Sequence, residues 1–193
     1  MKHTVPLILA SASPRRKALL SRLGVAFKVR AADIDETPLQ DEHPLEMTER
    51  LACAKARAIL EQCESPCWVL GSDTTVALGD RVFGKPSSHS DAVATLRLLS
   101  GNTHQVISSV CLAGKNWERV ESVTSHVRFG SLSESQIEAY CATDEPWDKA
   151  GGYGIQGLAG SFVEHIDGDY SAIVGLPLWT SSKLLRAARI LPE

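Results

Sequence analysis

The stretch LILASASPRRKALL, residues 7–20, runs an apolar segment straight into the start of a helix. The apolar residues Leu7–Ala10 are typical of a short buried strand. Ser13 is suited to cap a helix, because its hydroxyl accepts a hydrogen bond from an unpaired amide, and Pro14 fits the first helical position. Gly24 favours the end of that helix. A strand that passes at once into a helix favours an α/β protein.

The rest of the chain continues this mixture of helices and strands. Apolar periodicity predicts helices over residues 44–63, over 90–101 with Ser90 as the cap, over 133–143 with a capping box between Ser133 and Gln136, and from Thr180 onward. Strands are predicted over residues 25–35, over 67–86 with a turn at Gly79 and Asp80, and over 104–114 and 117–129. The last two alternate apolar and polar residues as an antiparallel pair does. Hairpins among the crossovers indicate the α/β class with a mixed sheet.

Composition limits the class of protein. The 193 residues are 44% hydrophobic and 22% charged, which is ordinary for a globular protein and predicts a single domain over residues 1–193. The net charge of −3 provides no basic field, so nucleic-acid binding is disfavoured. Five cysteines leave one without a partner and fit no zinc spacing, which favours reduced thiols and a cytoplasmic protein. No stretch is long enough to cross a membrane.

Two arginines lie in the first turn of the predicted helix. Arg15 and Arg16 have the wrong sign for this position, because the amino end of a helix carries a positive partial charge. The unpaired amides, both guanidinium groups and the hydroxyls of Ser11 and Ser13 would together bind an anion. The alternative, two solvated surface arginines, fits this stretch equally well, so both interpretations stay open.

Lys55 lies inside the apolar stripe of the helix predicted over residues 44–63. Leu51 and Ile59 are each four residues away and share its face. A lysine that faces the interior needs a negative partner, and a phosphate or a carboxylate would serve. The alternative is a lysine at the edge of the stripe that keeps its ammonium group in water.

Asp73 follows an apolar run in VLGSDTTV and is predicted to lie at or inside a strand. A carboxylate at such a position is costly unless it binds a cation or accepts good hydrogen bonds. Lys85, near the end of the next strand, is expected to lie close to it. The common alternative is a carboxylate at a strand end that is satisfied by backbone amides.

These charged residues form one pattern. The basic candidates Arg15, Arg16, Lys55 and Lys85 would neutralise phosphate, and the acidic candidates Glu36 and Asp73 would hold a divalent cation. Mg²⁺ typically uses one or two carboxylates together with phosphate oxygens. The pattern predicts phosphoryl chemistry without identifying the substrate.

A glycine-rich segment and the histidines have ordinary structural interpretations. The segment GYGIQG, residues 152–157, matches the glycine pattern of dinucleotide-binding proteins, but no strand precedes it and no helix follows it. A Rossmann fold is therefore disfavoured. No histidine has a recognisable catalytic spacing, so His104, His126 and His165 are interpreted as ordinary strand residues.

Eight segments, in order along the chain, carry a resemblance to a known family: LILASASPRRKALL, DIDE, RLACAKARA, GSDTTV, FGKP, LSGNTHQV, DKAGGYGIQG and VGLPL. They resemble the Maf family of nucleoside triphosphate pyrophosphatases, which was first named for an effect on septum formation. The match extends from about Leu7 to the final helix. The S-x-S-P-R-R and D-K-A-G-x-Y-G-I-Q-G blocks are highly specific in combination.

The resemblance implies a fold similar to the inosine triphosphate pyrophosphatases, with a long curved mixed sheet and two lobes around a cleft. It implies hydrolysis of a nucleoside triphosphate to the monophosphate and pyrophosphate with a divalent metal, Mg²⁺ or Mn²⁺. The residues carried over by motif are the general base Asp73, the metal ligands Glu36 and Asp73, and the substrate- and phosphate-binding residues Ser13, Arg16, Lys55 and Lys85.

Three positions separate the subfamilies. Arg15, Thr74 and Gln156 match members that prefer dTTP and UTP, whereas the sibling group that acts on 7-methyl-GTP has an aromatic residue and a glutamine at the first two. The resemblance therefore implies a dTTP/UTP pyrophosphatase that clears or edits nucleotides, modified pyrimidine nucleotides included. The same chemistry on 7-methyl-GTP or another nucleotide, and a non-catalytic nucleotide-binding regulator of cell division, are the alternatives. The sequence leaves the oligomeric state open, a homodimer included.

Overall fold

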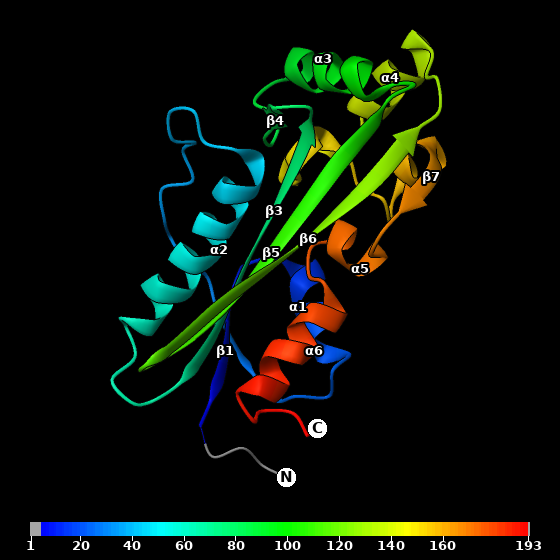
Figure 1. Ribbon diagram of the computed structural model, residues 1–193. Coiled ribbons are helices and arrows are strands. Elements are labelled where there is room, and N and C mark those ends of the chain that lie inside the picture. The colour runs from blue at the N-terminus through cyan, green and yellow to red at the C-terminus, as the bar shows by residue number, and fades with distance from the viewer. Residues whose placement is uncertain (1–4, 193) are drawn as a thin grey trace.

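Three long strands, β3 (Trp68–Leu78), β5 (Thr103–Gly114) and β6 (Trp117–Phe129), run from one end of the molecule to the other (Figure 1). The computed structural model describes residues 5–192. Both β3 and β6 pair with β5 in the antiparallel direction. The alternation of apolar and polar residues predicted the pairing of β5 with β6, and this prediction is confirmed.

Shorter strands complete one mixed sheet. Across the described residues the strand order is β2 (Lys28–Arg30), β1 (Leu7–Ala10), β3, β5, β6 and β7 (Val163–Asp167), with β4 (Arg81–Phe83) paired to β3. β1 is parallel to both β2 and β3, and the other pairs are antiparallel. The predicted α/β class with a mixed sheet is therefore confirmed.

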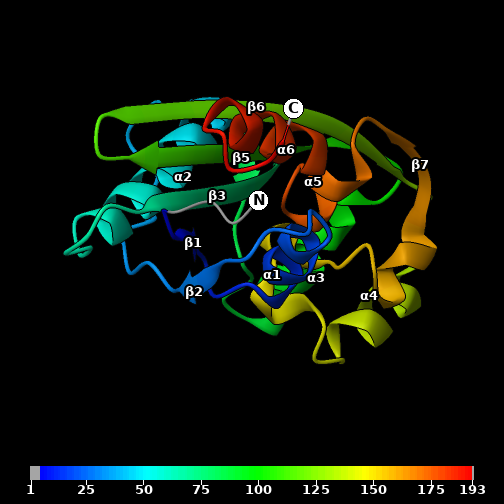
Figure 2. The same ribbon diagram turned by 90° about the horizontal axis from the view of Figure 1, so that it is seen from below.

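Helices cover both faces of this sheet and one of its ends. The helices are α1 (Pro14–Ser21), α2 (Pro44–Leu60), α3 (His89–Leu99), α4 (Glu134–Cys141), α5 (Tyr170–Val174) and α6 (Leu178–Ala187), with short 3-10 helices η1 (Pro146–Asp148), η2 (Ala150–Gly152) and η3 (Leu158–Phe162). Figures 1 and 2 show α2 on one side of the long strands and α1, α5 and α6 grouped on the other.

Alternate residues of β1 face opposite sides of the sheet, as the two-residue period of a strand requires. Leu7 and Leu9 pack in an apolar cluster with residues of α1 and α6. Ile8 and Ala10 pack in a second cluster with residues of α2. The short strand is therefore buried on both faces, which explains its continuous apolar sequence.

A third apolar cluster lies at the far end of the long strands. There, α3 and α4 pack with Phe129 of β6 and with Tyr153, which follows η2. The protein thus has two lobes that share one sheet, as expected from the family resemblance.

The parallel pairing of β1 with β3 brings distant residues together. Ala10 lies opposite Gly71, so the chain leaves β1 where β3 continues toward Asp73. Ser13 then caps α1 as predicted, because its hydroxyl accepts a hydrogen bond from the amide of Arg16 at 3.4 Å. The first turn of α1 is therefore placed beside the middle of β3.

Gly71 also lets α2 approach the sheet closely. A Cβ atom at this position would overlap the carbonyl oxygen of Ala52 and would lie 2.8 Å from the amide nitrogen of Ala56. The backbone of α2 consequently rests on the backbone of β3. This contact brings Lys55 within reach of Asp73.

Several predicted boundaries differ from the structure. The strand predicted over residues 25–35 is limited to Lys28–Arg30, because β1 offers only four residues for pairing. The cap of α3 is Ser88 rather than Ser90, since the Ser88 hydroxyl accepts from the amide of Asp91 at 3.2 Å. The capping box of Ser133 and Gln136 is confirmed.

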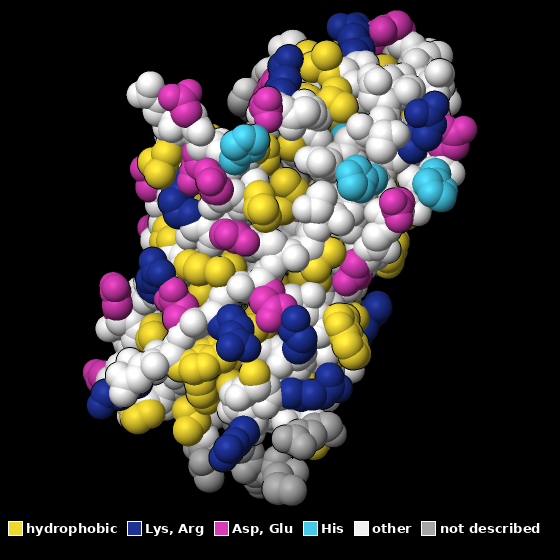
Figure 3. Space-filling view, in the orientation of Figure 1, with side chains coloured by type: hydrophobic (Ala, Val, Ile, Leu, Met, Phe, Trp, Pro, Cys, Tyr) yellow, Lys and Arg dark blue, Asp and Glu magenta, His cyan; other side chains and the backbone are white. Residues whose placement is uncertain are grey.

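Two surface properties agree with the composition. No helix within residues 5–192 combines the length and apolar character needed to span a bilayer. Figure 3 shows acidic and basic side chains mixed over one face of the molecule rather than a continuous basic surface.

Candidate functional site

A cleft of about 980 Å³ lies between the two lobes, in the size range of small-molecule sites. Its walls come from the end of β1, the start of α1, α2, β3 and the segment that carries η1 and η2. All nine predicted site residues line it: Ser13, Arg15, Arg16, Glu36, Lys55, Asp73, Thr74, Lys85 and Gln156. The structure therefore brings together residues that are spread over most of the chain.

Lys55 lies between two carboxylates at the floor of the cleft. Its Nζ atom is 2.6 Å from Oδ1 of Asp73 and 2.7 Å from Oε1 of Glu36. The Lys55 and Asp73 side chains are each 10% exposed, whereas Glu36 is 49% exposed. The prediction that Lys55 faces the interior and meets a negative partner is confirmed, and the partner is a carboxylate pair.

Lys55 favours the ionised form of Glu36. Burial would raise the pKa of Glu36, but the hydrogen bond and the positive charge of Lys55 outweigh it and lower that pKa. The more distant positive charges of Lys85 and Arg16 act in the same direction. Glu36 is therefore held in its ionised form beside Asp73.

Arg16 is half-buried and held by three neutral groups. Its Nε donates to the carbonyl oxygen of Gly175 at 2.9 Å, its Nη1 to the hydroxyl of Ser11 at 3.4 Å, and its Nη2 to the hydroxyl of Thr74 at 3.2 Å. Burial lowers the pKa of Arg16, and the charge of Asp73 opposes that effect. Within residues 5–192, no carboxylate forms an ion pair with Arg16. For Arg16, the solvated-surface interpretation is wrong.

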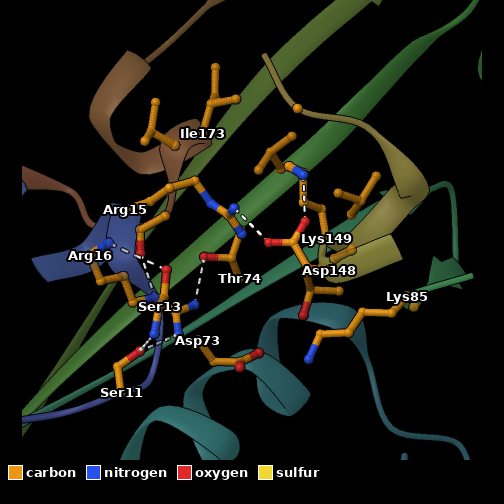
Figure 4. A pocket seen from close by; sticks show the side chains of 18 of the residues that line it. Ser11, Ser13, Arg15, Arg16, Asp73, Thr74, Lys85, Asp148, Lys149 and Ile173 are labelled. Atoms are coloured by element: carbon orange, nitrogen blue, oxygen red, sulfur yellow. Dashed lines mark hydrogen bonds and ion pairs between the residues drawn. The ribbon is translucent and has the colours of Figure 1, made fainter. Parts of the chain in front are cut away.

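Arg15, one residue earlier, points to the other side of the cleft. Its Nη1 donates to Oδ2 of Asp148 at 2.9 Å, and its side chain is 29% exposed (Figure 4). Asp148 also forms an ion pair with Lys149. Asp148 and Lys149 belong to the DKAGGYGIQG motif, but no local pattern assigns a role to Asp148, because its partner Arg15 is far away in the chain.

The remaining basic candidate, Lys85, follows β4 and extends into the cleft (Figure 4). It makes no ion pair with any carboxylate in the described part of the chain. Together with Arg16, it gives the cleft positive charge that is not already neutralised by contact with an acidic group. These two cations are suited to bind a negatively charged ligand.

The segment that carries Gln156 is folded around Glu145. The Glu145 carboxylate accepts hydrogen bonds from the amide of Leu158 at 2.8 Å, the amide of Ala159 at 3.3 Å and the hydroxyl of Tyr140 at 3.1 Å. A Cβ atom on Gly157 would overlap this carboxylate. Residues 145–159, which carry the predicted selector residue Gln156, are called the selector loop below. No local pattern in the sequence marks Glu145.

A buried pair ties the selector loop to the sheet. Nε2 of His104 on β5 is 2.7 Å from the hydroxyl of Tyr153, which lines the cleft. Burial lowers the pKa of His104 to about 4 and raises that of Tyr153. His104 lies in a strand as predicted, and it acts there as a neutral anchor.

The carboxylate pair fits a divalent cation by its chemistry. Glu36 and Asp73 both reach the same ammonium group, so they converge on one small volume at the edge of the cleft. Their second oxygens, Oε2 and Oδ2, accept no hydrogen bond from the described residues. Carboxylates with free oxygens are the donors that Mg²⁺ typically uses together with phosphate oxygens.

Comparison with known proteins gives consistent matches over nearly the whole chain. A family model described as Maf-like protein matches residues 6–188. The dTTP/UTP pyrophosphatase of Shewanella oneidensis is 50% identical over 192 residues, which cover 96% of this chain and 99% of that protein. The dTTP/UTP pyrophosphatase of Colwellia psychrerythraea is 46% identical, with 94% of this chain and 88% of that protein covered.

Solved structures that align with this chain have much lower identity. The Ham1 protein of Staphylococcus aureus aligns with a TM-score of 0.46 and 15% identity, over 64% of this chain and 71% of that one. A nucleoside-triphosphatase, or dITP/XTP pyrophosphatase, from Mycobacterium abscessus aligns with a TM-score of 0.44 and 16% identity, over 98% and 100%.

Proposed function

The chain belongs to the Maf family, and we propose that it hydrolyses dTTP and UTP to the nucleoside monophosphate and pyrophosphate. The observation that carries the proposal is the pairing of Lys55 with Glu36 and Asp73 in a cleft that also holds Arg16 and Lys85. Purely basic residues would suffice to bind a nucleotide, so the two carboxylates indicate catalysis.

The cations bind the triphosphate. Arg16 and Lys85 have no carboxylate partner among the described residues, so phosphate oxygens would supply the missing negative charge. Ser13 lies at the amino end of α1, where helix geometry also favours an anion. Arg16 is fixed by Gly175, Ser11 and Thr74 before any ligand arrives, and this reduces the entropy lost on binding.

Asp73 is the general base of the proposal. It is buried on a strand, so its carboxylate is held in a fixed position relative to the bound phosphates. It would orient a water molecule toward the α-phosphorus and accept its proton. Lys55 holds the carboxylate in place through the 2.6 Å hydrogen bond. The departing pyrophosphate would be stabilised by the same cations that bound it.

A divalent cation, Mg²⁺ or Mn²⁺, is proposed to be held by Glu36 and Asp73. When bound, it would polarise the attacked phosphate and neutralise part of its charge. Glu36 is half exposed and close to Lys55, so it can reach such a cation without burying a second unpaired charge.

The choice of dTTP and UTP is proposed for Arg15, Thr74 and Gln156. All three line the cleft, and the relatives named dTTP/UTP pyrophosphatase share about half of their residues with this chain. Thr74 has a second effect, because its hydroxyl accepts from Arg16 and also contacts Ser108 at 2.8 Å. A change at Thr74 would therefore disturb phosphate binding as well as base choice.

We also place the activity in the cytoplasm. The five cysteines are free thiols, as in a reducing compartment. Nucleotide pools that need clearing or editing are found in the same compartment.

The test is pyrophosphate release from a panel of nucleoside triphosphates with Mg²⁺ or Mn²⁺. The panel contains dTTP, UTP, CTP, 7-methyl-GTP and modified pyrimidine nucleotides. We expect the largest kcat/KM for dTTP and UTP and no turnover when metal is chelated. A preference for 7-methyl-GTP would replace the substrate assignment. Tight nucleotide binding without turnover would favour the non-catalytic regulator.

A matched control uses a charged pair outside the cleft. Arg97 and Glu134 form an exposed ion pair between α3 and α4. Arg97→Gln is expected to leave turnover of every nucleotide unchanged, because it removes one cation without touching the cleft. Equal losses in Arg97→Gln and Lys85→Gln would show that general charge, not the local site, governs activity.

A further inference from the structure

Adjacent arginines at the start of α1 have different partners. Arg16 is held by neutral oxygen atoms in the interior, whereas Arg15 reaches across the cleft to Asp148, 133 residues later in the chain. The two side chains therefore anchor α1 to opposite walls. Figure 4 shows the Arg15 guanidinium beside Asp148, with Lys149 on the far side of that carboxylate.

Asp148 is itself held in place by the selector loop. Lys149 donates to the carbonyl oxygen of Glu145 at 2.6 Å and also forms an ion pair with Asp148. Glu145 in turn accepts the amides that close the loop around Gln156. The Asp148 carboxylate thus lies in the same hydrogen-bonded loop as Gln156, a predicted selector residue.

Arg15 occupies an unfavourable position in its helix, and Asp148 offsets that cost. Arg15 lies in the first turn of α1, where the helix dipole disfavours a cation. Burial would raise the pKa of Asp148, but hydrogen bonds from Lys149 and Arg15 outweigh it and lower the pKa to about 2. Asp148 therefore carries its negative charge at neutral pH and offsets the unfavourable position of Arg15.

The contact with Asp148 leaves most of the Arg15 donors free. Only Nη1 of Arg15 donates to Asp148, and its Nε and Nη2 make no hydrogen bond within the described residues. A guanidinium group has five donors and no acceptor. Uracil and thymine present two carbonyl oxygens that can accept from such a group, whereas cytosine replaces one of them with an amino group that donates.

We infer that Asp148 is a positioning residue for substrate choice, because it holds Arg15 at the selector loop, where its free donors face the carbonyl oxygens of uracil or thymine. The inference rests on the proposed function. Without Asp148, Arg15 would be drawn toward the triphosphate instead, since phosphate is the stronger anion in the cleft. The base would then lose a fixed hydrogen-bond donor, and UTP would lose its advantage over CTP.

The experiment compares kcat and KM for UTP and CTP in the wild type, Asp148→Asn and Asp148→Glu. For Asp148→Asn we expect the UTP:CTP ratio of kcat/KM to fall about two- to fivefold, as suits one half-exposed ion pair. The loss should appear in KM for UTP, with kcat for UTP within about twofold of the wild type. Asp148→Glu should restore most of the ratio, because it keeps the charge.

A double-mutant cycle separates this role from a merely structural one. In an Arg15→Ala background, Asp148→Asn is expected to change the UTP:CTP ratio no further. Additive losses in the double variant would overturn the inference, and so would an unchanged ratio in Asp148→Asn. The matched control is Glu164→Gln, which removes an exposed 2.7 Å pair with Arg128 outside the cleft and should leave the ratio unaltered.

Wild-type measurements keep this test distinct from the test of the proposed function. If the wild type binds UTP but releases no pyrophosphate, the proposed function fails, and the ratio of calorimetric Kd values for UTP and CTP replaces the kinetic ratio. The same cycle then decides the role of Asp148. If the wild type binds neither nucleotide, both proposals are overturned.

Discussion

The two ends of the cleft are built in different ways. At one end, Lys55 on α2 and Asp73 on β3 meet across a backbone-to-backbone contact and are nearly buried. At the other, Arg15 meets Asp148 from an irregular segment, and that carboxylate is 59% exposed. Lys55 and Asp73, which are proposed to serve bond cleavage, both lie on regular elements, whereas Asp148, which is proposed to position Arg15, lies on a loop segment.

The difference has a kinetic consequence. Damage at the Lys55 and Asp73 end should lower kcat for every nucleotide alike, because the chemistry at phosphorus is common to all of them. Damage to the selector loop should change the ratio between nucleotides and leave the chemical step nearly intact. Two kinetic measurements test this division, and two stability measurements test the contacts that hold each end, from the largest expected effect to the smallest.

Asp73→Asn should have the largest effect. Loss of a general base lowers kcat by roughly 10²–10⁴-fold, and the UTP:CTP ratio should not change. Nucleotide affinity should survive, because Arg16 and Lys85 are untouched. Pyrophosphate release and calorimetric titration of dTTP measure both quantities. Near-normal turnover would remove Asp73 as the base and leave Glu36 as the next candidate.

Lys55→Met should couple activity to stability at the same end. It leaves the buried Asp73 carboxylate without its cation and beside Glu36, so the free energy of unfolding should fall by about 3–5 kcal/mol. Addition of Asp73→Asn should recover most of that loss, because the unpaired charge is then gone. Urea unfolding of both variants measures the effect. A double variant as unstable as Lys55→Met would show that packing, not charge, is responsible.

His104→Gln tests the contact between His104 and Tyr153 through the pH dependence of the free energy of unfolding. In the unfolded chain His104 gains a proton near its ordinary pKa of 6.5, whereas the folded protein resists protonation down to about pH 4. The free energy of unfolding should therefore fall as pH drops from 6.5 to 4, by up to about 1.4 kcal/mol per pH unit. His104→Gln keeps a group that can bond Tyr153 but cannot gain this proton. Urea midpoints at pH 7 and 5 should differ less in the variant, and an equal difference would contradict the assignment.

Gly157→Ala should have the smallest effect and change only selectivity. The new methyl group would displace the Glu145 carboxylate and shift Gln156. We expect the UTP:CTP ratio to fall by a few fold, with kcat for UTP nearly unchanged. Gly130→Ala is the matched control, because the nearest atom to its Cβ would be 3.9 Å away. A large loss of kcat in Gly157→Ala would contradict the expectation that the selector loop affects the choice of nucleotide and not the chemical step.

The end of the cleft that holds Lys55 and Asp73 could be largely predicted from the sequence. Helical periodicity placed Lys55 on a buried face, and the apolar run before Asp73 placed that residue inside a strand. Both signals are local, because each depends on neighbours within a few residues. The parallel pairing of β1 with β3, which no local pattern specifies, then brings Arg16 to the same place.

The end of the cleft where Arg15 meets Asp148 could not be predicted in the same way. Asp148 meets Arg15 across 133 residues, and Glu145 is an ordinary acidic residue until the amides of Leu158 and Ala159 fold back onto it. Even the different directions of Arg15 and Arg16 depend on distant groups, since Gly175 and Thr74 hold Arg16 and Asp148 holds Arg15.

The close approach of α2 at Gly71 restricts how this protein can change by mutation. Position 71 carries no side chain, yet any methyl group there would push the helix away from β3 and separate Lys55 from Asp73. Every single-base change that replaces this glycine would therefore act on turnover from a position that touches no nucleotide. In a saturation screen for activity, position 71 should be as intolerant as the proposed base itself, and a designer who wishes to repack this face of the sheet must leave that gap open.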